Sequence, residues 1–107
     1  MSDVASVAAA AVPADAVLLD VREDDEWEAG HAAGAFHIPM GEVPQRLGEL
    51  PAGELHVVCR AGGRSQRVAE WLQGNGRDVV NVEGGMGAWA EAGRSMVSES
   101  GEEPFVR

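Results

Sequence analysis

Three short apolar runs are the most regular feature of the hydrophobic pattern along this chain. They cover residues 17–21, 55–58 and 79–82, and each is bounded by charged or glycine-rich positions. Apolar runs of this length without alternation are typical of strands buried on both faces of a sheet. Strands that alternate with short helices indicate a parallel sheet. The pattern therefore predicts an α/β fold: a small, open, mostly parallel sheet with helices on both faces.

The segments between the runs have helical features. Asp24 can cap a short acidic helix that Gly30 ends. Pro44 suits the first turn of a second helix, which Pro51 closes. Two later helices are expected over residues 65–73 and between Gly85 and Gly93. Apolar helix faces predict three tryptophans in the core, namely Trp27, Trp71 and Trp89.

The two ends of the chain lack this regularity. The Ala-rich residues 4–12 are expected to form a short helix or a loosely held segment, and residues 34–39 a brief extended piece. Residues 94–107 are polar and expected to be irregular, although Phe105 and Val106 could pack back onto the domain. At 107 residues, the chain is expected to be one domain, with its core at about 13–93 and a C-terminal tail at 94–107.

Composition limits the partners. Eighteen acidic and eight basic residues give a formal charge of −10, which opposes binding to nucleic acid or to an anionic membrane because both are polyanions. No apolar stretch approaches the ~20 residues of a membrane span, and no basic region precedes the apolar start. A single cysteine excludes an internal disulfide and suits a reducing compartment. We therefore expect a cytoplasmic protein, a monomer by default.

That single cysteine, Cys59, is the strongest candidate for chemistry. It ends the second apolar run and precedes a glycine-bearing turn with Arg60 and Arg64, which leads into a helix. Ligands of open α/β sheets bind beyond the carboxyl ends of the strands. Turn amides and a helix start stabilise an anion there, and Arg67 can extend the positive rim. The pattern therefore predicts a reactive thiolate rather than an inert buried cysteine.

The run Cys59-Arg60-Ala61-Gly62-Gly63-Arg64-Ser65 resembles the active-site loop of the rhodanese-like sulfurtransferases. Further segments resemble the other signatures of that family, in the family's order: Asp20-Val21-Arg22, Glu26-Trp27, Gly30-His31, Gly34-Ala35, His37-Ile38-Pro39, Glu83-Gly84-Gly85-Met86 and Ala88-Trp89. Together they span about residues 17–93. The resemblance implies a single rhodanese-like domain that transfers a sulfane sulfur through a persulfide on Cys59, as thiosulfate sulfurtransferases do. No metal and no cofactor is expected.

The resemblance also implies roles for individual residues. Cys59 would be the catalytic residue, and the substrate-binding positions would be Arg60, Ala61, Gly62, Gly63, Arg64 and Ser65. The loop amides would hold the persulfide, while the two arginines orient the sulfonate group of thiosulfate. Asp20 and Arg22 are expected to support the pocket as an ion pair, more than to contact substrate. His31 and His37 are expected to order loops rather than to act as bases.

The resemblance does not identify a single sulfur donor or a single acceptor. They would be a small anionic sulfur donor, thiosulfate or another persulfide, and cyanide or a thiol as acceptor; a protein donor or acceptor is the other option. Some thiosulfate-specific relatives have a basic side chain where this sequence has Ala61. The preferred donor is therefore open.

Two other functions stay open from the residues alone. Dual-specificity phosphatases share the fold, but five residues separate their cysteine and arginine, whereas four separate Cys59 and Arg64. A phosphatase or arsenate reductase is therefore the weaker hypothesis. An activated thiolate also reacts with peroxide, so a thiol redox-sensing or interaction module is the third.

Overall fold

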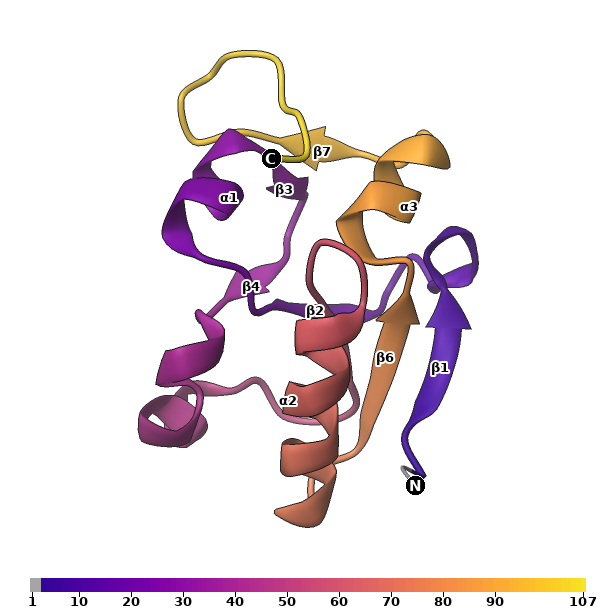
Figure 1. Cartoon of the computed structure of the whole chain (residues 1–107), viewed down its shortest axis with the longest axis vertical. Coiled ribbons are helices and arrows are strands. Elements are labelled where there is room, and N and C mark those ends of the chain that lie inside the picture. The colour runs from indigo at the N-terminus through magenta and orange to yellow at the C-terminus, as the bar shows by residue number, and fades with distance from the viewer. Residues whose placement is uncertain (1–2) are drawn as a thin grey trace.

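The computed structural model describes residues 3–107, and a five-stranded sheet lies at its centre (Figure 1). The strand order is β1-β6-β5-β2-β4, and every neighbouring pair is parallel. The strands are β1 (Ala5–Ala8), β2 (Val17–Asp20), β4 (Phe36–His37), β5 (Leu55–Val58) and β6 (Val79–Glu83). The α/β class and the three strands read from the apolar runs are thereby confirmed.

The core has two parts, one on each face of the sheet. Successive strand residues point to opposite faces, and accordingly Val57 lies in one buried cluster and Val58 in the other. The first cluster includes residues of α2 (Gly63–Gly74), and the second includes residues of α3 (Gly85–Glu91). Burial on both sides explains why three of the four residues of β5 are apolar and why all four positions, including His56, are buried.

The remaining helices are short. The first, α1 (Asp24–Ala29), is capped one residue earlier than expected: Glu23 is the N-cap and forms a reciprocal capping box with Glu26. The helix expected from Pro44 exists as a 3-10 helix, η3 (Pro44–Glu49), with a kink at Arg46, and another 3-10 helix, η2, precedes it at Met40–Glu42. Pro44 does occupy its first turn, as predicted.

The expectation for the Ala-rich start was wrong. Its first part is a strand, β1, which pairs in parallel with β6 from Ala5 opposite Val80 to Ala8 opposite Glu83. A single 3-10 turn, η1 (Ala9–Ala11), follows it. Strand β6 would otherwise present an open edge of main-chain donors and acceptors, and β1 satisfies them. The sheet therefore begins before the range of 13–93 expected for the core.

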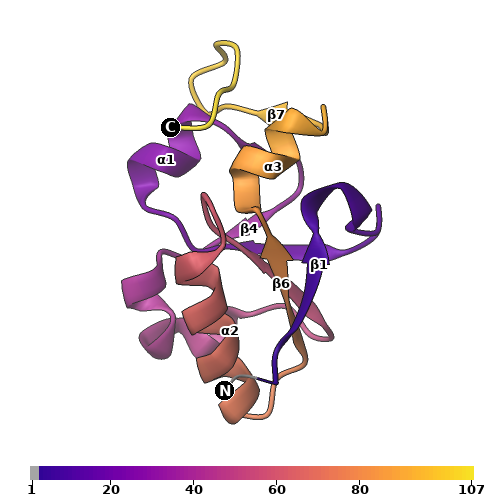
Figure 2. The same ribbon diagram turned by 45° about the vertical axis from the view of Figure 1, so that its right-hand side comes forward.

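The C-terminal segment is more ordered than expected. Its β7 (Met96–Val97) forms an antiparallel pair with β3 (His31–Ala32). Farther on, the amide of Phe105 donates to the carbonyl of Ala29, and Val106 packs against the second core cluster, as its apolar character had indicated. In both views this segment lies beside α1, at the end of the molecule away from the N-terminus (Figure 1, Figure 2).

The tryptophans differ in their surroundings. Trp89 is buried at 6% exposure, whereas Trp71 is 39% exposed, so the prediction of a core position for Trp71 was wrong. Trp71 instead lines a groove of about 210 Å³ between α2 and the residues around η2. Among residues 3–107, no helix has both the length and the apolar character that crossing a bilayer requires.

Candidate active site

The candidate residues gather where the parallel strands end. Cys59 directly follows β5 and is 1% exposed. Asp20 is the last residue of the neighbouring strand β2, paired with Val58. The loop after Cys59 leads into α2, and α3 begins beside that loop. The topology thus brings the loop, the start of α2 and the ion-pair residues to one edge of the sheet, as the sequence predicted, and it adds the start of α3.

The first two carbonyl groups of the loop are bound to the start of α3. The carbonyl oxygen of Cys59 accepts a hydrogen bond of 2.8 Å from the amide of Met86, and that of Arg60 accepts one of 3.0 Å from Gly87. This contact needs a glycine at position 85. Gly85 has a φ of +55°, and a Cβ there would overlap the Cys59 oxygen and lie 2.6 Å from the carbonyl carbon of Arg60.

The third anchored carbonyl belongs to Gly62. It accepts hydrogen bonds from the amide of Gln66 (3.1 Å) and the side-chain Nδ2 of Asn81 (3.3 Å). The hydroxyl of Ser65 lies 3.2 Å away and shares its single proton between this oxygen and Cys59 Sγ. In a trans peptide, the carbonyl of one residue and the N–H of the next point in opposite directions. The hydrogen bond from α3 to the Arg60 carbonyl therefore turns the Ala61 amide the other way, and this amide is a hydrogen-bond donor to Cys59. The amide of Gly62 itself donates to Cys59 Sγ over 3.1 Å.

The Cys59 sulfur therefore lies among hydrogen-bond donors. Besides the Gly62 amide, the Ser65 hydroxyl lies 3.3 Å from Sγ and donates to it. Burial raises the pKa of the Cys59 thiol, but hydrogen bonds from Ser65 and from the amides of Gly62 and Ala61 outweigh burial, so that the net pKa is below the ordinary value. A lowered pKa increases the fraction of thiolate, the nucleophilic form of cysteine.

Arg64, the second residue of α2, forms a bidentate ion pair. Its Nη1 and Nη2 lie 2.7 and 2.9 Å from the two carboxylate oxygens of Glu26, on α1. The same carboxylate accepts the amide of Glu23 over 3.0 Å. The hydrogen bonds from Arg64 hold the pKa of Glu26 at about 2, and they raise the pKa of Arg64 in turn.

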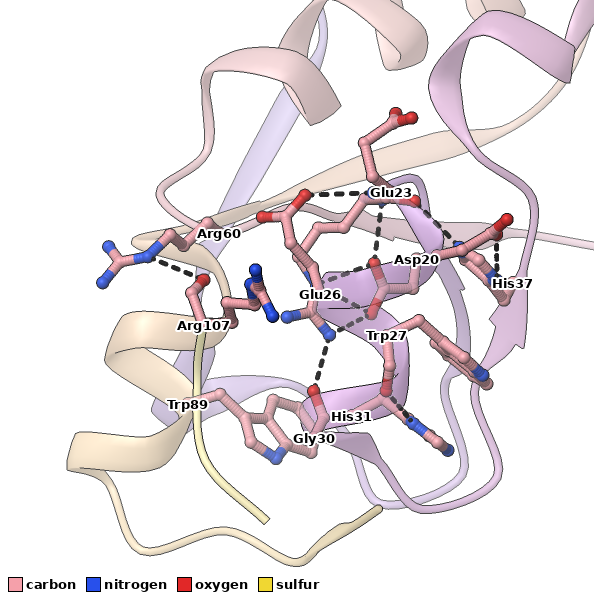
Figure 3. A network of polar contacts seen from close by, with 12 residues as sticks. Asp20, Glu23, Glu26, Trp27, Gly30, His31, His37, Arg60, Trp89 and Arg107 are labelled. Atoms are coloured by element: carbon pink, nitrogen blue, oxygen red, sulfur yellow. Dashed lines mark hydrogen bonds and ion pairs between the residues drawn. The ribbon is translucent and has the colours of Figure 1, made fainter. Parts of the chain in front are cut away.

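Arg60 is bound as well. Its Nε donates to the main-chain oxygen of Arg107 over 3.1 Å (Figure 3). Nε of Arg107 in turn lies 3.2 Å from a carboxylate oxygen of Asp25. Both loop arginines expected to orient a sulfonate group thus contact protein groups in this structure. Arg67 is exposed on α2 and lines the groove that also contains Trp71.

Asp20 and Arg22 form the expected ion pair. Both side chains are 0% exposed, and Nη2 of Arg22 lies 2.8 Å from Oδ2 of Asp20. Nη2 also donates to the carbonyl of Gly30, at the end of α1 (Figure 3). The pair therefore joins β2 to α1, on which Glu26 lies. This is a structural arrangement, as we expected from the sequence.

The histidines order the same region. The ring of Trp27 stacks on His31 and on His37, with centroids 3.5 and 4.6 Å away (Figure 3). Nδ1 of His31 lies 2.8 Å from the carbonyl of Trp27, and Nε2 of His37 lies 2.8 Å from that of Arg22. These stacking and main-chain contacts are those of residues that hold a loop in place.

Two residues of the site were missed in the sequence. Asn81 was included in an apolar run, although a polar residue inside the run Val79-Val80-Asn81-Val82 was a usable signal. Glu26 was read only as part of a short acidic helix and of a family signature, with no role in the site. No local pattern connects it with Arg64, which is 38 positions away.

Comparisons with known proteins agree with this geometry. The model of the rhodanese-like domain matches residues 4–92. A sulfurtransferase of Allochromatium vinosum is 37% identical over 90 residues, which cover 81% of this chain and 83% of that protein. The crystal structure of a rhodanese-related protein from Thermoplasma volcanium matches with a TM-score of 0.81 and 33% identity, over 87% of this chain and 97% of that one. The thiosulfate sulfurtransferase of Pseudomonas aeruginosa matches with a TM-score of 0.77 and 26% identity, over 97% of this chain but 22% of that one.

Proposed function

The chain belongs to the rhodanese-like domain family, and from this premise we propose that it transfers sulfane sulfur through a persulfide on Cys59. One observation carries the proposal: Sγ of Cys59 is buried and accepts hydrogen bonds from the Gly62 amide and the Ser65 hydroxyl. Donors fixed in this way stabilise a negative sulfur without reorganisation during the reaction. Both forms in the cycle, the thiolate and the persulfide anion, carry such a charge.

Two displacements make up the proposed cycle. The thiolate of Cys59 attacks the outer sulfur of thiosulfate, a new S–S bond forms, and the old S–S bond breaks so that sulfite leaves with the electron pair. Cys59 is left as a persulfide anion. Cyanide or a thiolate acceptor then attacks the terminal sulfur, and Cys59 leaves as a thiolate. The products are thiocyanate or an acceptor persulfide, and charge is balanced in each step.

The loop residues have separate roles in this proposal. The main-chain amides from Arg60 to Ser65 surround the sulfur anion, and the Ser65 hydroxyl adds one donor. Arg60 and Arg64 contact an anionic donor at the rim in competition with the protein groups that they bind in this structure. Asp20 and Arg22 contact neither donor nor acceptor; they hold α1 against the end of β2.

The test is the intact mass of the reduced protein before and after incubation with thiosulfate. A gain of one sulfur atom is expected, which cyanide removes with release of thiocyanate and which Cys59→Ser abolishes. The double variant Cys59→Ser/Ala90→Cys is a matched control, because it carries one cysteine at an exposed position of α3 without the loop. It should gain little sulfur if loading depends on the loop.

Other outcomes would overturn the proposal. No gain from thiosulfate or from an alkyl persulfide would contradict sulfur transfer. Turnover of an aryl phosphate that Cys59→Ser abolishes would favour the phosphatase hypothesis. Oxidation by peroxide that is much faster than sulfur loading would favour a redox sensor.

A further inference from the structure

We propose that Glu26 is a specificity-determining positioning residue: by binding Arg64, it directs the site toward singly charged persulfide donors and away from dianionic thiosulfate. This inference rests on the proposed sulfur transfer by Cys59 and adds the class of donor.

The contact between Glu26 and Arg64 is well defined. Two parallel hydrogen bonds of 2.7 and 2.9 Å join the planar guanidinium to the planar carboxylate, which is the strongest geometry available to this pair. The Glu26 side chain is 13% exposed, and the Arg64 side chain 36%. The Glu23 amide donates to the same carboxylate, at the Oε1 that Nη1 of Arg64 also contacts. Arg64 is therefore directed toward α1, and an incoming anion must compete with a carboxylate already in place.

Arg64 consequently offers little net charge to a donor. With a pKa of about 2, Glu26 is ionised at neutral pH and compensates the guanidinium. Of the other two guanidiniums beside the loop, Arg107 has the carboxylate of Asp25 as its partner, and Arg60 donates to a main-chain oxygen of Arg107. The carboxylate of Glu23 also acts on Arg64, so that carboxylates compensate most of the positive charge beside the loop.

The two donor classes differ in the charge that this region must accept. Thiosulfate carries two negative charges, whereas an ionised alkyl persulfide carries one. Both present an outer sulfur to the same thiolate, so that the attack on sulfur does not discriminate between them. Surroundings in which the positive charges are compensated favour the persulfide. The second negative charge of thiosulfate loses hydrating water on binding, and no uncompensated cation replaces that water.

Replacement of Glu26 by glutamine separates its effect on charge from its effect on helix α1. Glutamine can still accept the Glu23 amide, because the capping box works with either residue. The substitution removes one negative charge and frees the Arg64 guanidinium. If the freed positive charge raises kcat/KM about threefold for each negative charge on the donor, it raises kcat/KM about tenfold for a dianion.

The experiment compares the rates at which thiosulfate and 2-hydroxyethyl persulfide load Cys59. Glu26→Gln should raise kcat/KM for thiosulfate about tenfold, mainly through KM, and kcat/KM for the persulfide about threefold. It should also lower the Cys59 pKa, measured from the ultraviolet absorbance of the thiolate. Glu28→Gln is the matched control: it removes the same charge from an exposed position of α1, and both rates should change less than about twofold.

The outcomes are decisive in either direction. Equal changes for the two donors in Glu26→Gln, or a fall in the use of thiosulfate, would overturn the inference while leaving sulfur transfer intact. Failure of both donors to load the wild-type protein would instead reject the proposed function. If Glu26→Gln does not fold, as judged by circular dichroism, Glu26→Asp replaces it: the shorter side chain keeps the charge but withdraws the carboxylate from Arg64. A smaller shift in the same direction is then expected, and no shift overturns the inference.

Discussion

Gly85 is expected to be the most sensitive glycine of the candidate site. Its φ of +55° lies in the left-handed region, and an added Cβ would be 2.6 Å from both the carbonyl carbon and the oxygen of Arg60. The neighbouring main-chain atoms cannot move aside as a flexible side chain does. Gly85→Ala therefore forces α3 away from the loop and weakens the hydrogen bonds from Met86 to Cys59 and from Gly87 to Arg60.

The size of the effect follows from these contacts. A non-glycine residue in the left-handed region costs about 1–2 kcal/mol, forced repacking about 1–3 kcal/mol, and each weakened hydrogen bond about 0.5–1.5 kcal/mol. We expect Gly85→Ala to lower the free energy of unfolding by about 3–8 kcal/mol, a large part of the roughly 5–15 kcal/mol of a typical domain. Because loop carbonyls are released, loop amides turn away from the sulfur, and the Cys59 pKa should rise.

Two assays measure these effects. Urea unfolding gives the free energy, and the pH dependence of iodoacetamide alkylation gives the thiol pKa. Gly87→Ala is the matched control: its Cβ would meet the Arg60 oxygen at 3.5 Å, an ordinary contact, and alanine is the better helix former by about 1 kcal/mol. It should be neutral or stabilising. A loss below about 1 kcal/mol in Gly85→Ala, with an unchanged Cys59 pKa, would refute the argument that α3 shapes the loop.

Three further predictions concern charge. Ser65→Ala removes a donor to Sγ, so the Cys59 pKa should rise and persulfide formation at neutral pH should fall about three- to tenfold; an unchanged pH profile of alkylation would contradict this. Asp20→Ala leaves the buried charge of Arg22 without its partner, so urea unfolding should show a loss of about 3–5 kcal/mol, and a loss under about 1 kcal/mol would contradict it. The folded-state pKa of Glu26 is about 2, below the ordinary 4.5, so its contribution to stability is complete above pH 4.5 and is lost as pH falls toward 2. In unfolding experiments at several pH values, Glu26→Gln should lose less stability than the wild type between pH 4.5 and 2. An equal loss in both proteins would be inconsistent with the lowered pKa of Glu26.

The buried strands and the loop were predictable because their signals are local. A short, mostly apolar run followed by cysteine, glycines and a helical pattern indicates a strand, a turn and a helix without knowledge of any distant partner. The edge strand β1 was not predictable in this way. Alanine has low strand propensity, and residues 5–8 are extended because β6 offers an unpaired edge.

The partners of the charged residues in the site were not predictable either, because they are distant in the sequence. The positions of Arg60 and Arg64 beside Cys59 could be read from the sequence, but their partners could not. Glu26 and the main-chain oxygen of Arg107 come from segments 38 and 47 positions away. Arginines that appear in the sequence as free cations for a substrate are therefore bound in the folded protein, because the topology brings α1 and the C-terminal segment to the same edge.

The pairing of β1 with β6 has a consequence for synthesis of the protein. Ala5 lies opposite Val80, so some 75 residues must be made before the first strand has a partner. Closing so long a loop is slow, and it costs entropy that only the finished contact offsets. Strand β1 is thus made long before its partner and is among the last strands of this sheet to be placed. Since β6 continues directly into Gly84 and Gly85, the strand that receives β1 and the turn that shapes the Cys59 loop complete their folding together.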